Sequence, residues 1–304
     1  MNNLNKCDQL LALLRTRQNQ NAQELARSLS VSVPQLQRLL FELARHGVEF
    51  EQFESSIQLS PEYEFLNEEE IRGRLSTFAN STVSRIILRG LLDSTSKEAR
   101  RLNFPGANDA YLVLAEMQTA GHGRRGREWV STFASNIYLT VVWPVDGSLD
   151  QLSAASLVAA LSLVTALRSL SLKGSDKLRV KWPNDVWLDN QKLAGILPEL
   201  YRHATDRHQL AIGIGLNVHL PPPLLGSIEQ PATDLRSQGN TCSNRNVLVA
   251  ALINQLCADL ERFIAEGFGV FRRSWCELDA MLNCTVEVLS GNGAKSGIAA
   301  GVDN

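Results

Sequence analysis

Hydrophobic residues near the start of the chain recur at the spacing of short amphipathic helices. Three groups of leucines at helical spacing follow one another within residues 8–46, which predicts three helices. Asn21 with Glu24, and Ser32 with Gln35, form patterns typical of helix starts. The short segment SLSVS separates the second group from the third. This is the spacing of a helix-turn-helix.

The pattern then changes from helical spacing to alternation. Residues 48–60, VEFEQFESSIQLS, alternate between apolar and polar side chains and predict a two-stranded ribbon. A ribbon in this place is the wing of a winged helix, so we expect a winged helix-turn-helix domain over residues 1–62. Residues 63–82 begin with an acidic stretch, and we expect them to be a linker.

From residue 83 onward, strand patterns alternate with helical ones. We expect helices over residues 95–102, 152–172, 246–266 and 268–282, and strands in RIILRGLLDS, YLVLAEMQ, NIYLTVVWPV, LRVKWP, KLAGILPELY and HQLAIGIGLNV. Such a chain predicts an α+β or mixed α/β domain of catalytic size at residues 83–282. Residues 283–304 contain only about two strands, and an isolated hairpin is marginal in water. We therefore expect them to be the start of an incomplete small β domain.

The composition fits a folded protein without general affinity for nucleic acid or membranes. The 304 residues are 44% hydrophobic and carry a formal net charge of −2, so any contact with DNA has to be local. No apolar run reaches the roughly 18 residues of a membrane span and no signal-peptide pattern begins the chain, so we expect a cytoplasmic protein. The widely spaced cysteines form no CxxC pair, and we interpret them as reduced structural thiols. They are Cys7, Cys242, Cys257, Cys276 and Cys284.

One loop has a composition that no protein core would use. Residues 118–129, QTAGHGRRGREW, hold three glycines and three arginines between two apolar strands. Glycine lets main-chain N–H groups approach an anion, and arginine offers forked donors to carboxylate or phosphate oxygens. The loop lacks the GxxxxGK[ST] pattern, and a strand follows it where a dinucleotide site would need a helix. It is either an anion-binding loop that folds over its ligand, or a basic surface loop or nucleic-acid patch.

Three further polar segments lie at the ends of predicted strands. KWPND, residues 181–185, is either an ordinary turn or a group of ligand-binding side chains. KLAGIL, residues 192–197, begins with a lysine that can reach solvent, whereas Gly195 leaves room for a ligand on the strand. In DSTS, residues 93–96, hydroxyl groups can cap the next helix with Glu98 as the reciprocal partner, or bind a ligand there.

The order of these segments resembles one enzyme family. LDSTS, AEMQTAGHGRRGREW, VKWPNDVWL, KLAGIL and GIGLNV together look like the biotin–protein ligases. With the leading helix-turn-helix, the chain is similar to the bifunctional bacterial class, a biotin–[acetyl-CoA-carboxylase] ligase that is also a biotin operon repressor. The resemblance implies a biotin/lipoate ligase-like catalytic domain and a small SH3-like C-terminal β domain. It also implies an enzyme that forms biotinoyl-5'-AMP from biotin and ATP with Mg²⁺, and that biotinylates a lysine of the biotin carboxyl carrier protein of acetyl-CoA carboxylase.

The resemblance assigns roles to individual residues. The biotin site would consist of Ser94, Thr95, Ser96, Gln118, Gly121, His122, Gly123, Arg124, Lys192 and Gly195. The nucleotide site would consist of Arg124, Arg127, Trp129, Lys181, Asn184, Asp185 and Asn217. Lys192 and Arg124 would be catalytic, and Asp185 would hold the metal.

Two positions depart from the pattern of the family. Ser96 stands where asparagine is common, and His122 stands where arginine is usual, which removes one fixed positive charge from the loop. Imidazole can still donate to an oxyanion. Attack of the biotin carboxylate on the α-phosphate spreads negative charge over phosphoryl oxygens, which the basic residues of the site could neutralise.

The front domain has a weak charge signature for DNA binding. By resemblance, Gln35, Gln37 and Arg38 would read base edges of an operator. Residues 1–65 nevertheless hold six Lys/Arg (Lys6, Arg15, Arg17, Arg27, Arg38, Arg45) against eight Asp/Glu (Asp8, Glu24, Glu42, Glu49, Glu51, Glu54, Glu62, Glu64). One alternative is therefore a ligase with a purely structural winged helix. His122 and the short C-terminal segment leave a second alternative open, a biotin or adenylate sensor with poor ligase activity. The family also suggests a ligand-dependent homodimer that forms through a strand edge beside the loop.

Overall fold

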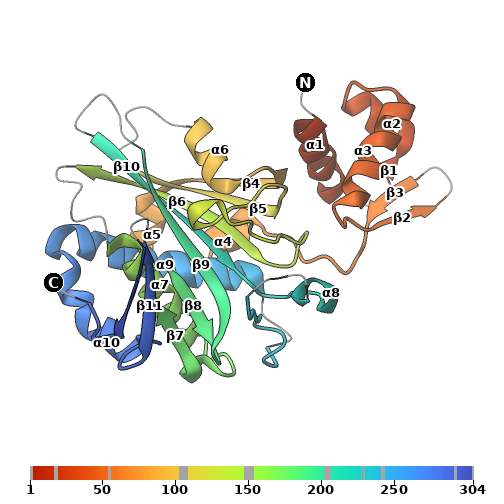
Figure 1. Cartoon of the computed structure of the whole chain (residues 1–304). Coiled ribbons are helices and arrows are strands. Elements are labelled where there is room, and N and C mark those ends of the chain that lie inside the picture. Colours follow the sequence, from red (N-terminus) through yellow and green to blue (C-terminus); the bar gives the residue numbers. More distant parts are fainter. Residues whose placement is uncertain are drawn as a thin grey trace.

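The computed structural model of the chain contains a small N-terminal unit, a large unit built on a sheet, and a C-terminal hairpin (Figure 1). The described residues are 3–16, 20–53, 56–102, 109–146, 154–201, 207–226, 228, 230–240, 244–290 and 293–302. Three residues named above, Arg17, Glu54 and Cys242, lie outside them. Within the described ranges, the helices are too short or too polar to cross a membrane.

The N-terminal unit has the expected three helices followed by the expected ribbon. Its elements are α1 (Asn3–Thr16), α2 (Ala22–Ser28), α3 (Val33–Arg45), β1 (Gln20–Asn21), β2 (Phe50–Phe53) and β3 (Ser56–Leu59), with the strands in the order β1-β3-β2. Ser32 and Gln35 cap α3 reciprocally, because the main-chain N–H of each donates to the side chain of the other. The start of α2 is capped by Asn21 alone, which accepts from Gln23 N–H at 2.8 Å.

The segment that we expected to be a linker, residues 63–82, is folded into the central unit. It forms two short helices, α4 (Glu68–Arg72) and α5 (Thr77–Thr82). Leu66, Ile71 and Ala79 are fully buried and belong to the main hydrophobic core. Glu62, Glu64 and Glu69 around them are exposed, and this acidic composition is what made the segment resemble a linker.

A seven-stranded mixed sheet forms the centre of the large unit, in the order β4-β5-β6-β10-β9-β8-β7. The strands are β4 (Val83–Leu92), β5 (Ala110–Gln118), β6 (Ile137–Asp146), β7 (Leu178–Lys181), β8 (Asp185–Leu188), β9 (Gln191–Tyr201) and β10 (Arg207–Leu216). β4 and β5 are parallel and are connected through α6 (Thr95–Leu102), whereas the other neighbouring strands are antiparallel. The mixed α/β fold is as predicted, and β8 is a strand that we did not expect.

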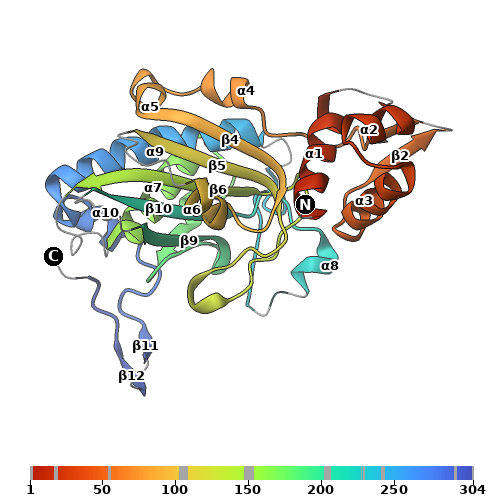
Figure 2. The same cartoon turned by 90° about the horizontal axis from the view of Figure 1, so that it is seen from above.

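Helices cover the two faces of the sheet unequally (Figure 2). Helices α7 (Ala155–Ser169) and α9 (Arg245–Glu266) pack on one face with the main core, and α7 is buried on nearly every side, as its apolar composition requires. Helix α6 covers only part of the other face, over a smaller cluster of apolar residues. The rest of that second face is left for a site.

The remaining elements connect or follow these layers. They include α8 (Pro222–Leu225), the 3-10 turn η4 (Phe268–Phe271), α10 (Arg272–Leu278), and the hairpin of β11 (Thr285–Ser290) and β12 (Gly293–Ile298). The single helix expected over residues 268–282 is therefore wrong, because it is divided into η4 and α10 and ends at Leu278. All residues of β12 are exposed.

Candidate active site

Four strands place small and charged residues side by side on the open face of the sheet. Lys181 lies opposite Asp185 across β7 and β8, and Asp185 lies opposite Gly195 across β8 and β9. Gly195 in turn lies opposite Gly215 on β10. Residues opposite one another in antiparallel strands point to the same face. Their neighbours in the chain are buried in the main core on the other face, namely Val180, Val186, Ile196 and Ile214.

A β-bulge brings Lys192 to this same face. Strict alternation would place Lys192 and Gly195 on opposite faces, because they are three residues apart. The pairing of β8 with β9 shifts register and leaves Leu193 without a partner, and such bulges redirect side chains. Lys192 Nζ lies 2.9 Å from Asp185 Oδ1, and the two side chains are only 15% and 17% exposed. The predicted catalytic lysine and the predicted metal ligand thus form a largely buried ion pair.

The indole ring of Trp129 lies on a floor formed by two glycines. A Cβ atom on Gly215 would lie 2.5 Å from Trp129 Cε2, and one on Gly195 would lie 2.9 Å from Trp129 Cζ3. Lys192 Nζ is 5.5 Å from the centre of the ring, within the range of a cation–π contact. Trp129 Nε1 is buried and has no hydrogen-bond partner among the described residues. Because a buried unpaired donor is costly, this position of the ring leaves a donor for a ligand to satisfy.

A chain of buried hydroxyl groups lies beneath the start of α6. Thr140 Oγ1 donates to Thr95 Oγ1 at 2.9 Å, and Thr95 Oγ1 donates to Gln118 Oε1 at 3.2 Å. Each hydroxyl group has one proton, so Ser96 must be the donor in its 3.3 Å contact with Thr140. We call Ser96, Thr140, Thr95 and Gln118 the hydroxyl relay; its hydrogen bonds all run toward Gln118.

The relay fixes the orientation of the Gln118 side chain. Gln118 Oε1 also accepts from Thr95 N–H at 2.8 Å, so the oxygen faces the start of α6. The amide nitrogen faces the loop, where a Cβ on Gly121 would lie 2.8 Å from it. Ser94 is 3% exposed and lies beside this group. Ser94, Thr95, Ser96 and Gln118 are therefore brought together as predicted, and Gln118 offers a donor toward Gly121.

The glycine–arginine loop is folded back on itself. Gly123 N–H donates to the Arg127 carbonyl at 2.8 Å, and Trp129 N–H donates to the Gly121 carbonyl at 3.0 Å. In Figure 2 the yellow-green connection between β5 and β6 extends away from the sheet. Main-chain bonds thus shape the loop, and Trp129 holds its second end on the glycine floor.

The charged side chains of this loop lie at its tip. The main chains of His122 and Glu128 pair as a short antiparallel β-bridge, and the side chains of Arg124 and Arg127 are exposed. The structure therefore brings Gly121 and Trp129 to the site, and it leaves the two predicted anion-binding arginines in solvent. An exposed arginine can reach a phosphate only if the loop moves toward the sheet.

The three remaining predicted nucleotide residues make contacts of their own. Lys181 Nζ lies 4.2 Å from the centre of the Trp187 ring. Asn184 Nδ2 donates to a main-chain carbonyl of β9 at 2.7 Å, and Asn217 Nδ2 donates to the carbonyl of residue 233 at 3.1 Å. The amide donors of both asparagines thus brace the main chain around Lys192.

The start of α6 differs from the capping box that we expected. The Thr95 hydroxyl belongs to the relay, and Glu98 forms ion pairs with Arg89 at 3.3 Å and Arg101 at 3.5 Å. The Arg101 guanidinium also bonds to Asp93 and holds the pKa of that carboxyl below its usual range. The capping interpretation of DSTS is wrong, because arginines outside the segment take its acidic partner.

Sequence reasoning missed three features of the site. Thr140 is a polar residue within the apolar strand NIYLTVVW, and Glu116 is a carboxylate within YLVLAEMQ. Both are fully buried, and a polar residue within an apolar strand was the signal that could have found them. The third feature is the glycine pair of β10, Gly213 and Gly215, within GIGLNV; a Cβ on Gly213 would lie 2.9 Å from Ser96 Oγ.

A cavity of about 650 Å³ lies beside the start of β9. The main chain of Lys192 joins it to the site, because Lys192 N–H donates to the Pro231 carbonyl at 2.9 Å and Thr233 N–H donates to the Lys192 carbonyl at 3.0 Å. The residues that line this cavity are uncharged. The lysines of the site therefore lie on the sheet face and not in the cavity.

The predicted DNA-reading residues lie on the exposed side of α3. Gln35 is engaged by Ser32 in the capping box. Gln37 and Arg38 are exposed, and Phe41, one turn further on, is 67% exposed. The outward face of α3 therefore combines an amide, a guanidinium group and an aromatic ring.

Comparison with known proteins identifies the class to which this fold and site belong. The profile of the biotin/lipoate A/B protein ligase family matches residues 90–217, which run from the end of β4 through the loop to the end of β10. The bifunctional ligase/repressor BirA of Escherichia coli (strain K12) is 33% identical over 296 residues, which are 97% of this chain and 88% of the relative. The biotin–[acetyl-CoA-carboxylase] ligase of Paracoccus denitrificans is 36% identical over 217 residues, 70% of this chain and 88% of the relative.

Solved structures agree with this class. A point mutant of the biotin protein ligase from Aquifex aeolicus, in complex with biotin, has a TM-score of 0.58 and 26% identity, covering 72% of this chain and 88% of that chain. A mixed sheet with an open, glycine-floored face and a Gly–Arg loop is therefore the sheet of a biotin/lipoate-type ligase. Within that class the chain belongs to the biotin–protein ligase family, as the resemblance of its motifs predicted.

Proposed function

We propose that this ligase joins biotin to AMP and then transfers biotin to a lysine of biotin carboxyl carrier protein. In the first step, a carboxylate oxygen of biotin attacks the α-phosphorus of ATP and pyrophosphate leaves. In the second step, the lysine amine attacks the acyl carbon, loses a proton, and AMP leaves. The observation that carries the proposal is the largely buried Lys192 beside the Gly195–Gly215 floor. A fixed cation beside a strand surface without side chains suits a reaction whose transition state develops negative charge at one place.

The hydroxyl relay marks the end of the site for the uncharged ring system of biotin. Ser94, Thr95 and Ser96 supply hydroxyl groups in a nearly closed space, and Gln118 presents a donor because its oxygen is already used. The absence of a side chain at Gly195 leaves room for the valeryl tail. In this proposal the carboxylate of biotin would lie near Lys192.

The glycine–arginine loop would complete the site by moving. Gly121, His122 and Gly123 can bring main-chain N–H groups to the carboxylate and phosphate, and Arg124 and Arg127 can add charge once the loop closes. Closure also keeps water from the labile anhydride. Trp129 occupies the glycine floor here, so its proposed role in the nucleotide site requires the ring to leave that floor when ligand enters.

The nucleotide and its metal would lie on the Lys181–Asp185 side. Asn184 and Asn217 support the main chain there. The described residues contain no cluster of three potential metal ligands. A single carboxylate fits Mg²⁺, since this ion is commonly held by one or two carboxylates together with phosphate oxygens. Asp185 would hold it, and the ion would neutralise phosphate charge when bound.

We also propose that residues 1–62 are a winged helix that binds operator DNA, so that the ligase represses biotin synthesis genes in response to biotin. The outward face of α3 supports this, because Gln37 and Arg38 suit base edges and the Phe41 ring suits a thymine methyl group. The Escherichia coli relative is named a ligase/repressor. A band shift of an operator fragment that weakens steeply with salt would support repression, and a shift absent at low salt would exclude it.

The domain division and the assembly follow from the same proposal. We propose a catalytic domain that starts at residue 63, since α4 and α5 belong to its core, and a small β domain that begins at residue 283. A ligand-dependent homodimer would use an edge of the sheet, and the two edge strands are β4 and β7. Sedimentation with and without biotin and MgATP tests that assembly.

Mass spectrometry of the acceptor tests the ligase proposal directly. The purified chain is incubated with biotin, MgATP and a biotin carboxyl carrier domain. We expect a single mass gain of one biotinoyl group on the carrier, which Lys192→Ala abolishes. The matched control is Lys177→Ala, an exposed lysine that pairs with Asp189 and should ligate normally. A folded wild-type chain that binds biotin but transfers none would favour the sensor alternative.

A further inference from the structure

The hydrophobic core of the N-terminal unit includes residues from two strands of the central sheet. Leu10, Leu11 and Leu14 of α1 share one buried cluster with Leu91 of β4 and Met117 of β5. Leu91 lies three residues before the first residue of the proposed biotin site, and Met117 directly precedes Gln118. The front unit and the biotin site are therefore built on the same two strand ends.

Asp8 of α1 binds the edge of β4. Its Oδ1 atom accepts from Gly90 N–H at 2.6 Å and from Leu91 N–H at 3.2 Å. β4 is the outermost strand of the sheet, so these donors face the helix rather than another strand. A Cβ on Gly90 would lie 2.9 Å from Leu11 Cβ. Only glycine at this position lets α1 lie against the strand without moving.

Arg15, about two turns after Asp8 along α1, reaches β5. Its Nη2 atom lies 3.6 Å from Oε1 of Glu116, whose side chain is fully buried. Leu66 connects the same pair, because its N–H donates to Glu116 Oε1 at 2.8 Å and its carbonyl accepts from Arg15 at 2.5 Å. Glu116 stands two residues before Gln118. A charged residue of the front unit thus contacts the strand that carries the end of the hydroxyl relay.

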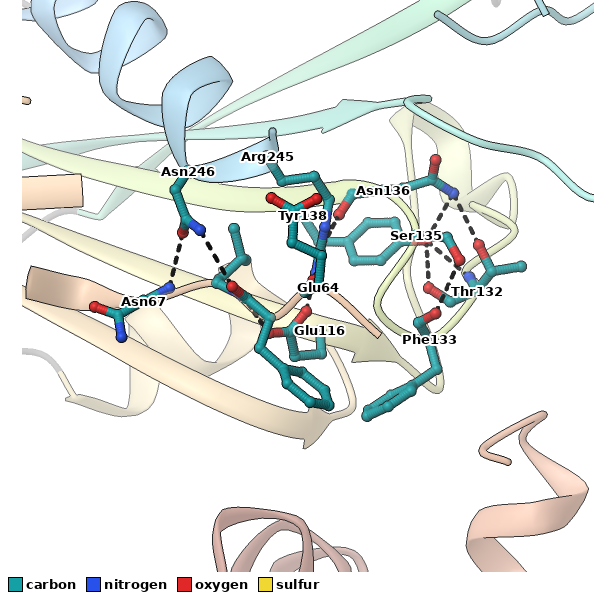
Figure 3. A network of polar contacts seen from close by, with 12 residues as sticks. Glu64, Asn67, Glu116, Thr132, Phe133, Ser135, Asn136, Tyr138, Arg245 and Asn246 are labelled. Carbon is teal, nitrogen blue, oxygen red and sulfur yellow. Dashed lines mark hydrogen bonds and ion pairs between the residues drawn. The ribbon is translucent and has the colours of Figure 1, made fainter. Parts of the chain in front are cut away.

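Glu116 is also anchored from the side of α9 (Figure 3). Arg245 Nη1 lies 2.8 Å from Glu116 Oε2 and forms an ion pair with it. Arg245 Nη1 donates its hydrogen bond to the Asn136 carbonyl at 3.1 Å instead, so Glu116 Oε2 has no hydrogen-bond partner among the described residues. Asn136 Oδ1 accepts from Val218 N–H at 2.7 Å, next to Asn217. The Glu116 carboxylate lies between two guanidinium groups, those of Arg15 and Arg245. Removal of the Arg15 side chain leaves Glu116 paired with Arg245, so the fold should tolerate that substitution.

We propose that helix α1 positions the biotin site, with Asp8 and Arg15 as positioning residues that hold the ends of β4 and β5. The proposal rests on the placement of biotin at Ser94–Ser96 and Gln118. The two strand ends are joined at the site by the 2.8 Å bond between Thr95 N–H and Gln118 Oε1. Loosening either strand end weakens that bond and lowers the affinity for biotin, whereas the groups around Lys192 keep their places.

The test compares Arg15→Met with Arg27→Met in the full chain. Arg27 is an exposed arginine of α2 and serves as the matched control. We expect Arg15→Met to raise KM for biotin about three- to thirtyfold, with KM for ATP and kcat changed less than about twofold. Gly90→Ala leaves every charge in place and displaces α1 by its methyl group, so it should raise KM for biotin in the same way. Arg27→Met should behave as wild type.

Amide hydrogen exchange of the same proteins measures how firmly the two strand ends are held, and it does not depend on catalysis. Exchange at residues 91–96 and at Gln118 should be faster in Arg15→Met than in Arg27→Met. If the wild type ligates biotin and both Arg15→Met and Gly90→Ala keep its KM, the positioning role is overturned while the ligase proposal stands. If the wild type ligates nothing, the ligase proposal fails, and unchanged exchange in Arg15→Met would then overturn the positioning role as well.

Discussion

Lys192 Nζ and Asp185 Oδ1 lie 2.9 Å apart in a largely buried ion pair, although the reaction needs them for different partners. In the proposed mechanism Lys192 binds the carboxylate oxygens of biotin and the phosphate oxygens of ATP, and Asp185 binds the metal. Each therefore compensates the burial of the other until ligands arrive. The pair must separate, or share its charges with ATP, when the site is filled.

Asp185→Asn tests this division of labour. The change keeps the shape of the side chain and removes both the partner of Lys192 and the proposed metal ligand. We expect kcat/KM to fall about 10²- to 10³-fold and the Mg²⁺ concentration for half-maximal rate to rise. Initial rates over a Mg²⁺ titration measure both effects. Asp189→Asn, an exposed carboxylate at the end of the same hairpin, should leave both unchanged, and an unaltered Mg²⁺ requirement in Asp185→Asn would remove Asp185 from the metal site.

Gly215→Ala tests whether ligand and indole share the glycine floor. The added methyl group would lie 2.5 Å from the Trp129 ring, so the ring must move, and the methyl group then fills space proposed for ligand. Biotin affinity by titration calorimetry should fall about tenfold, since overpacking by one methyl group costs about 1–3 kcal/mol.

The matched control for that variant is Gly297→Ala. A Cβ at Gly297 meets no atom within 4 Å, so this protein should bind biotin as the wild type does. Unchanged biotin affinity in Gly215→Ala would show that the tail does not pass over β10.

The elements of the central unit could be read from the sequence because their apolar residues alternate clearly. Strand patterns such as YLVLAEMQ and the nearly all-apolar α7 have few other interpretations. The segment 63–82 could not be read, because its three buried anchors are spread among acidic residues in short helices. Its burial depends on α9, which lies far away in the chain, and local patterns do not report such contacts.

The residues of the site could be predicted from the sequence, but how their side chains lie relative to one another could be predicted less well. The motifs named Lys192 and Gly195, yet alternation alone would have put them on opposite faces, and only the bulge at Leu193 unites them. Thr140 joins the site through side-chain hydrogen bonds from a different strand. The local pattern of a single strand holds no information on such pairing. It did, however, show the anomaly of a polar residue within an apolar strand.

Thr140→Val tests the direction of the hydroxyl relay. Valine keeps the shape, leaves Ser96 without an acceptor and removes the donor to Thr95, so the Gln118 amide loses part of its orientation. KM for biotin should rise about five- to tenfold, in line with about 1–1.5 kcal/mol for a lost buried hydrogen bond. Thr140→Ser retains the hydroxyl group and should restore the wild-type KM. Equal KM values for the valine and serine variants would mean that the relay does not orient the biotin site.

Cysteine reactivity tests the burial of the two cores. Cys284 is exposed, whereas Cys7 and Cys257 are buried, and burial raises the pKa of Cys7 to about 11 and that of Cys257 to about 12. Alkylation needs the thiolate, and at about pH 8 both buried thiols stay protonated. Iodoacetamide followed by peptide mapping should therefore modify Cys284 quickly and the buried pair only after unfolding. Cys284→Ser should abolish fast labelling of the peptide that contains residue 284, and labelling of Cys257 at the rate of Cys284 would contradict the packing of α9 against the sheet.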